Sequence, residues 1–157
     1  MNKKIRGFEE VNMYNKCHSE PTIVPSRSTK GSAGADFRIK ESLIIKPGET
    51  VVTMSDVKAY MGENEVLKIY VRSSVGIKKK LRLPNGTGII DSDYYSNPDN
   101  DGNIGIALHN FGEDTVYLSE GERVVQGIFI NFLIPDEEEV KGTRIGGVGS
   151  TGKKELI

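Results

Sequence analysis

The chain has 157 residues, long enough for one domain with a substantial core and too short for two comfortable ones. Its formal net charge of −1 at pH 7 offers no basic surface for DNA, RNA or an anionic membrane. The one cysteine, Cys17, excludes an internal disulfide, and with two histidines it makes a Cys/His zinc site untenable. Because no apolar run reaches the length of a signal peptide core or a membrane span, we expect a cytoplasmic protein.

Eighteen glycines and many short apolar segments separated by turn signals predict an all-β fold. Strands are expected within 5–13, 43–45, 50–53, 57–61, 66–71, 89–90, 104–110, 116–118 and 124–132. Pro47 and Gly48, at the centre of residues 46–49, predict a type II turn. No helix of ordinary length is expected, and about ten short strands favour a sandwich, jelly roll or barrel.

The stretch 85–94, NGTGIIDSDY, concentrates polar and small residues around a short apolar pair. Residues 89–90 are expected to form a buried strand that holds Asp91 against an apolar wall, which suits a general base acting on water. Tyr94 offers a flat face to a sugar or a base. The alternative is a β-turn in which Asp91 and Asp93 bond backbone N–H groups.

Two further segments indicate anion binding. Arg72 is followed by Ser73 and Ser74 at the end of a predicted strand, which favours an anion site or a short helix capped by either serine. Residues 147–153 match G-x-x-x-x-G-K, but Lys154 stands where a P-loop needs Ser or Thr. The tail therefore predicts either a glycine-rich arm that closes over a polyphosphate or a disordered terminus.

Five stretches in this order resemble the trimeric dUTP diphosphatases (dUTPases): AGADF at 33–37, RSS at 72–74, NGTGIIDSDY at 85–94, GERVVQ at 121–126 and RIGGVGSTGK at 144–153. The resemblance implies a distorted jelly-roll β-barrel over 1–140, a mobile arm over 141–157, and a homotrimer with active sites at subunit junctions. It also implies Mg²⁺-dependent cleavage of dUTP to dUMP and pyrophosphate. That reaction keeps uracil out of DNA and supplies dUMP for thymidylate synthesis.

Residue roles follow from the same resemblance. Asp91 matches the carboxylate that activates the attacking water. The residues expected at the uracil and the deoxyribose are Asn85, Gly88, Ile89, Ile90, Gly105 and Tyr94. The residues expected at the phosphates are Arg72, Ser73 and Ser74 from a second subunit, and Arg144, Ser150 and Thr151 from the arm of a third. Asp36 and Gln126 are expected near the triphosphate, in contact with Mg²⁺ only through water.

The chain departs from the family pattern at three places. Val148 stands where the arm usually has a phenylalanine that stacks on uracil, so closure is expected to be weaker or differently made. Arg144 lies one residue nearer the glycines than is common. Residues 95–101 look like an insertion in a hairpin that is usually tight, and we expect an exposed loop there, with a protein partner as one hypothesis for its role.

Three other functions compete with dUTP hydrolysis. A dCTP deaminase shares the fold, but its motif continues Pro-Gly after the aspartate, where this chain has Ser92, Asp93 and Tyr94. A non-catalytic nucleotide-sensing regulatory protein has no need to retain Asp91 together with Tyr94. A purely structural β-domain leaves the five ordered motifs without a purpose.

Overall fold

The computed structural model describes residues 3–149, and nearly all of its regular structure is β-strand. The strands are β1 (Gly7–Glu10), β2 (Ser26–Arg27), β3 (Ala35–Arg38), β4 (Leu43–Ile45), β5 (Thr50–Met54), β6 (Val57–Tyr60), β7 (Glu65–Val71), β8 (Leu81–Arg82), β9 (Gly88–Asp91), β10 (Gly105–Asn110), β11 (Val116–Leu118) and β12 (Arg123–Asn131). The helical elements are α1 (Ser73–Ile77) and the 3-10 turn η1 (Ser92–Tyr94). No helix within the described range is long and apolar enough to cross a membrane.

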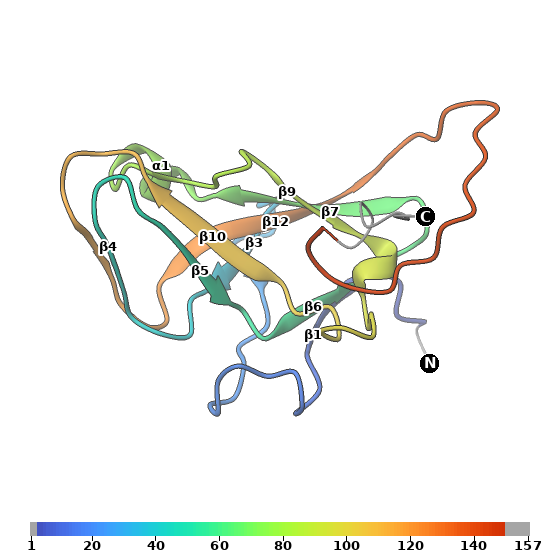
Figure 1. The fold of residues 1–157 in the computed structure, drawn as a ribbon, viewed down its shortest axis with the longest axis horizontal. Helices are drawn as coiled ribbons and strands as arrows, with labels where there is room; N and C mark the ends of the chain where they lie inside the picture. Colours follow the sequence, from blue (N-terminus) through green and yellow to red (C-terminus); the bar gives the residue numbers. More distant parts are fainter. Residues whose placement is uncertain (1–2, 150–157) are drawn as a thin grey trace, which may run out of the picture.

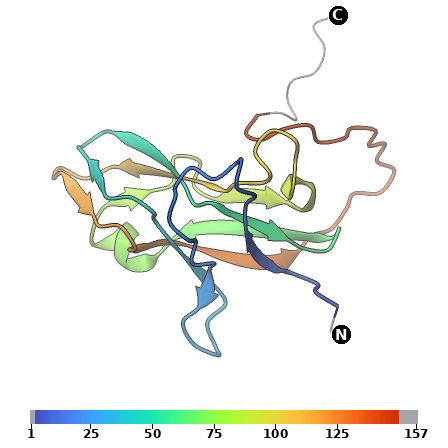
Figure 2. The same cartoon turned by 90° about the horizontal axis from the view of Figure 1, so that it is seen from below.

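The strands form small antiparallel sheets that wrap around one core (Figure 1). The largest sheet has the order β2-β3-β12-β7-β9, and a second has the order β5-β10-β8. The pairs β1-β6 and β11-β4 complete the arrangement. Seen along the perpendicular direction, β10 lies in one layer, and β7 and β12 lie in the layer facing it (Figure 2).

Alternation along the strands sends every second side chain into the core. On β10, Ile106 and Leu108 are buried, and on the opposite layer Leu67, Ile69 and Val125 meet them. On the outward face of the large sheet, Gln126 lies opposite both Asp36 and Tyr70. The fold therefore carries a polar row on the outside of the sheet.

The turn over residues 46–49 forms as predicted. Gly48 has φ +78°, which the third position of a type II turn requires, and the amide of Glu49 donates to the carbonyl of Lys46. The two strands that it joins do not pair with each other, because β4 pairs with β11 and β5 pairs with β10. The turn thus carries the chain from one sheet to another.

Two local predictions were wrong. Neither serine caps α1, because Arg72 keeps an extended conformation and is itself the N-cap, with Ser73 and Ser74 in the first turn. The loop after Tyr94 is only partly exposed: Asn97 and Asp101 are buried, whereas Ser96, Pro98 and Asp99 are exposed. Asparagine side chains bond to the loop's own backbone, and this allows polar residues to be buried.

Candidate active site

A cavity of about 460 Å³ lies between β9 and β10. It is lined by the predicted base, Asp91, and by the residues that were predicted to contact a nucleoside, Asn85, Gly88, Ile89, Ile90, Tyr94 and Gly105. Much of its apolar wall comes from Val52, Ile69, Leu83 and Ala107. Residues far apart in the chain therefore meet at one concave site, which is the usual form of a small-molecule pocket.

Both strands that border the cavity present an unpaired edge. In the described part of the chain β9 pairs with β7 alone, and residues 105–108 of β10 pair with β5 alone. A free strand edge presents backbone N–H and C=O groups to a ligand. Glycine is required at residue 88, because a Cβ there would lie 2.9 Å from the Cβ of Ile69. The site can therefore read a flat heterocycle with main-chain groups.

Asp91 ends β9 and points outward. Alternation places Ile89 and Asp91 on the solvent side of the strand, and the Asp91 side chain is 53% exposed. The expectation of a buried strand that holds a partly buried carboxylate was wrong for the single chain. Asp91 instead forms an ion pair with Arg144, whose Nη2 lies 2.6 Å from its Oδ2, while Arg144 Nε lies 2.7 Å from Asp93 Oδ1.

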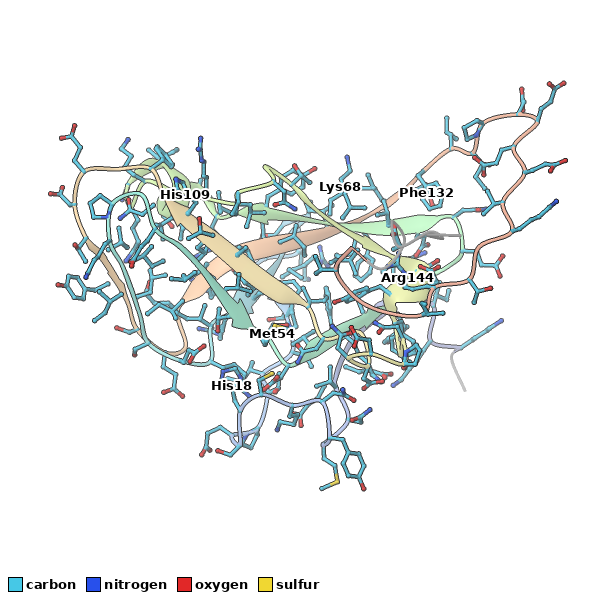
Figure 3. The ribbon with its side chains drawn as sticks, in the orientation of Figure 1. His18, Met54, Lys68, His109, Phe132 and Arg144 are labelled. Carbon is cyan, nitrogen blue, oxygen red and sulfur yellow. The ribbon has the colours of Figure 1, made fainter. Side chains whose placement is uncertain are left out.

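Arg144 belongs to the segment that leaves β12, extends away from the barrel and returns beside η1 (Figures 1 and 3). Its guanidinium also lies over the ring of Tyr94, 5.7 Å from the centroid. Three residues later the amide of Gly147 donates to Asp99 Oδ2 at 3.2 Å. Val148 is 99% exposed, so polar contacts rather than stacking hold this segment down. Ser150 and Thr151 lie outside the described residues.

A second group of polar residues surrounds the start of α1. Arg72 Nε and Arg123 Nη1 each lie 3.1 Å from the carboxylate of Asp36, and the hydroxyl of Ser28 donates to the same group at 3.0 Å. Ser73 and Ser74 are exposed beside Arg72. A cavity of about 450 Å³ opens here and is lined by Arg38, Arg72, Ser74, Val75, Lys79, Glu120, Gly121, Glu122 and Arg123. Its several cations suit a phosphate ligand.

The two groups lie at opposite ends of β7. The register pairs Asp91 with Val66, whereas Arg72 follows the far end of the strand. At about 3.3 Å per residue, the stretch from Val66 to Arg72 spans roughly 20 Å. In one chain the basic group is therefore too far from Asp91 to share a small ligand with it.

A sequence model of the dUTPase family matches residues 20–154. The chain belongs to the dUTPase family. It is 46% identical over 151 residues to the deoxyuridine 5'-triphosphate nucleotidohydrolase of Lactococcus lactis, with 95% of this chain and 99% of the relative covered. The same barrel occurs in the dUTPase of Streptococcus mutans, with a TM-score of 0.74 and 42% identity over 83% of this chain and 98% of that one. These matches confirm the predicted jelly-roll fold.

A mutant dUTPase from phage phi11 of S. aureus, which coordinates a structural Mg(II) ion, superposes with a TM-score of 0.69 at 22% identity, over 88% of this chain and 98% of that one. At that identity the likeness shows the fold alone. In this dUTPase-family chain, no cluster of three or more His, Cys, Asp or Glu side chains within residues 3–149 is arranged to hold a metal ion.

The sequence prediction missed part of the basic group. Arg38, Lys79 and Arg123 line the same cavity as Arg72, although they come from three other segments. Arg123 lies inside the GERVVQ motif, so the resemblance to the dUTPases could have indicated that it lies near the phosphates. Arg38 and Lys79 carried no such signal, because only the sheet register and the packing of α1 bring them there.

Proposed function

We propose that this chain hydrolyses dUTP to dUMP and pyrophosphate. The observation that carries the proposal is the cavity between the free edges of β9 and β10, which Asp91 and Tyr94 line together. Membership of the dUTPase family supports the same reaction.

Asp91 is the proposed general base. Its carboxylate accepts a proton from a water molecule, whose oxygen attacks the α-phosphorus of dUTP. The bond between that phosphorus and the bridging oxygen to the β-phosphorus breaks, and pyrophosphate leaves. Because little covalent chemistry is asked of the protein, positioning and charge neutralisation supply most of the rate enhancement. The exposure of Asp91 leaves room for the water once Arg144 of the same chain has left this carboxylate.

Uracil is read by the backbone of Gly88, Ile89, Ile90 and Gly105, with help from Asn85. A main-chain donor that faces O4 of uracil would face the amino group of cytosine instead and would lose its partner, which is costly in a dry site. Tyr94 packs under the deoxyribose and leaves no room for a 2′-hydroxyl.

The complete site needs more than one subunit. Arg72, Ser73 and Ser74 bind the phosphates of a nucleotide held by the neighbouring chain, since within one chain they lie roughly 20 Å from the residue that faces Asp91. We propose a homotrimer with an all-β barrel over 1–140 and an arm over 141–157. The arm of a third chain brings Arg144, Ser150 and Thr151 over the triphosphate.

Mg²⁺ would sit on phosphate oxygens, with Asp36 and Gln126 in contact with its water shell. Arg72, Arg123 and Ser28 use three of the roughly four lone-pair directions of the Asp36 carboxylate, and this leaves Oδ1 able to accept one bond from a water. These residues therefore suit a contact through water and not direct ligation. When bound, Mg²⁺ would neutralise phosphate charge and favour one triphosphate conformation. The chain itself holds the Gln126 side chain against Gly34, at the strand position that pairs with Asp36.

In the cell, this activity would keep uracil out of DNA and supply dUMP for thymidylate synthesis in the cytoplasm. A protein partner, if the 95–101 loop has one, would meet the exposed residues Ser96, Pro98 and Asp99.

The test is pyrophosphate release from dUTP, dCTP, dTTP and UTP with Mg²⁺. We expect selective turnover of dUTP, and a loss of 10²- to 10⁴-fold in kcat for Asp91→Asn. Asp114→Asn, which alters an exposed carboxylate in a distant loop, is the matched control and should leave turnover unchanged. Formation of dUTP from dCTP would overturn the proposal in favour of a deaminase, and dUTP binding without turnover would favour a sensor.

A further inference from the structure

The loop of residues 95–103 forms hydrogen bonds with both the backbone carbonyl and the side-chain hydroxyl of Tyr94. The side-chain Nδ2 of Asn97 donates to the Tyr94 backbone carbonyl at 2.8 Å. At the other end Asn100 Nδ2 donates to the Tyr94 hydroxyl at 2.9 Å, and that hydroxyl donates to the carbonyl of Asn103 at 2.9 Å. Tyr94 is 8% exposed and Asn100 is half-buried, so the bonds from Tyr94 to Asn97 and Asn103 are buried and the bond from Asn100 is partly buried.

The orientation of Asn100 is fixed by its other contacts. Its Oδ1 accepts from Asn97 Nδ2 at 2.8 Å and from the amide of Gly102 at 3.0 Å. A flipped amide would place a donor against two donors, so Nδ2 must face the Tyr94 hydroxyl. The loop is therefore built to supply one donor to that oxygen.

The remainder of the loop is anchored to the barrel independently of Tyr94. Asp101 accepts from Lys58 Nζ on β6 and from the amide of Asn12 at 2.7 Å. Asn103 Nδ2 donates to the buried carboxylate of Asp56 at 3.0 Å. These anchors hold the loop in place, so a change at Asn100 need not release the whole segment.

We propose that Asn100 is a positioning residue that sets the preference for deoxyribose over ribose by fixing the ring of Tyr94. This inference rests on the proposed function, in which Tyr94 is the floor beneath the sugar. A side chain in van der Waals contact with the sugar excludes the 2′-hydroxyl of ribose only if it cannot move, because a shift of a fraction of an ångström would make room for that oxygen. Because the Tyr94 hydroxyl donates one hydrogen bond, to Asn103, and accepts another, from Asn100, its ring cannot rotate without breaking a hydrogen bond.

The experiment measures kcat/KM for dUTP and for UTP in the wild type and in Asn100→Ala. We expect the ratio of dUTP to UTP to fall about five- to tenfold, as the loss of one partly buried hydrogen bond implies. The ratio of dUTP to dCTP should not change, since the backbone of β9 and β10 reads the base. Asn100→Asp keeps the acceptor for Asn97 and Gly102, removes the donor to Tyr94, and should lower the sugar ratio in the same way.

Asp101→Asn is the matched control, because it weakens an anchor of the same loop without touching Tyr94. Tyr94→Phe should lower the sugar ratio by a similar factor, and combining it with Asn100→Ala should add little. Equal losses on dUTP and UTP in both Asn100 variants, or an equal change of the ratio in Asp101→Asn, would overturn the inference. If the wild type hydrolyses neither nucleotide, the proposed function fails and this inference fails with it; a selective wild type with an unchanged ratio in the variants refutes the inference alone.

Discussion

The buried carboxylate of Asp56 joins two loops to the barrel, and its removal gives the sharpest stability prediction. It is fully buried and accepts hydrogen bonds from the amides of Cys17 and His18, from the His18 ring and from Asn103, at 2.8 to 3.0 Å. Figure 3 shows His18 where the N-terminal loop meets the barrel. We call this carboxylate and its four donors the Asp56 clamp.

The size of the effect follows from which donors lose their partner. Asp56→Asn keeps the shape of the side chain, and asparagine tolerates the backbone φ of +57° at this position. The substitution removes the negative charge, and the new side-chain NH₂ group faces N–H groups that need an acceptor. Hydrogen bonds to a charged group contribute about 1.5–3 kcal/mol each, and the two loop amides can turn to water, so we expect a loss of about 2–3 kcal/mol. Asp56→Ala adds a backbone penalty of about 1–2 kcal/mol at positive φ.

Urea unfolding at one fixed protomer concentration measures this loss. With a slope of about 2 kcal/mol per molar, Asp56→Asn should lower the midpoint by about 1–1.5 M. Asp114→Asn, an exposed carboxylate, is the control and should remain within about 0.5 kcal/mol of the wild type. A shift for Asp56→Asn as small as that of the control would refute the claim that the clamp stabilises the fold.

Three further predictions concern pH, Gln126 and the arm. Burial opposes ionisation of the Asp56 and Asp101 carboxyls, but the hydrogen bonds that they accept outweigh it and lower both pKa values below the usual 3.8. The stabilisation from these two carboxylates is therefore present above about pH 4 and is lost as the pH falls through their lower folded pKa values. A melting temperature that does not change between pH 6 and pH 3 would contradict this. Gly34→Ala should reduce kcat nearly as much as Gln126→Ala, because a Cβ at residue 34 would overlap the Gln126 side chain; normal turnover would show that the contact is unimportant. Asp99→Ala removes a contact that holds the arm on its own chain, so the arm reaches the neighbouring site more easily and KM for dUTP should fall about threefold to tenfold with little change in kcat; a rise in KM would show that the arm acts on the site of its own chain.

Most strands could be predicted from the pattern of apolar residues and from the turn residues between them. The strands β5, β7, β10 and β12 were predicted within one or two residues, because β7 and β10 alternate apolar and polar residues and β5 and β12 are apolar or β-branched runs bounded by turn signals. β2, β3 and β8 were missed: β2 and β8 have two residues each, too few to show a period, and β3 continues a run of small residues that is typical of a turn. The start of α1 was misplaced because a serine after a strand suggests a cap, whereas the backbone stays extended at Arg72, after the end of β7, and Arg72 is the N-cap.

The site was less predictable where it depends on contacts between distant segments. The nucleoside pocket was anticipated because one contiguous stretch supplies most of it. The pairing of Asp36 with Arg72 depends on sheet register, which the local sequence does not specify. Asn97 and Asn100 were expected in an exposed loop, because a run of polar residues looks the same whether its side chains face water or bond to their own backbone.

In the proposed trimer, the basic group around Arg72 of one chain completes the nucleoside pocket of another. Mixing Arg72→Ala chains with Asp91→Asn chains, by unfolding and refolding them together in equal amounts, tests this arrangement directly. Each variant alone should be nearly inactive, and the mixture should recover about one quarter of wild-type activity, since random assembly around a threefold axis places an intact Asp91 beside an intact Arg72 in that share of junctions. A mixture no more active than the mean of the two separate variants would contradict a site shared between subunits.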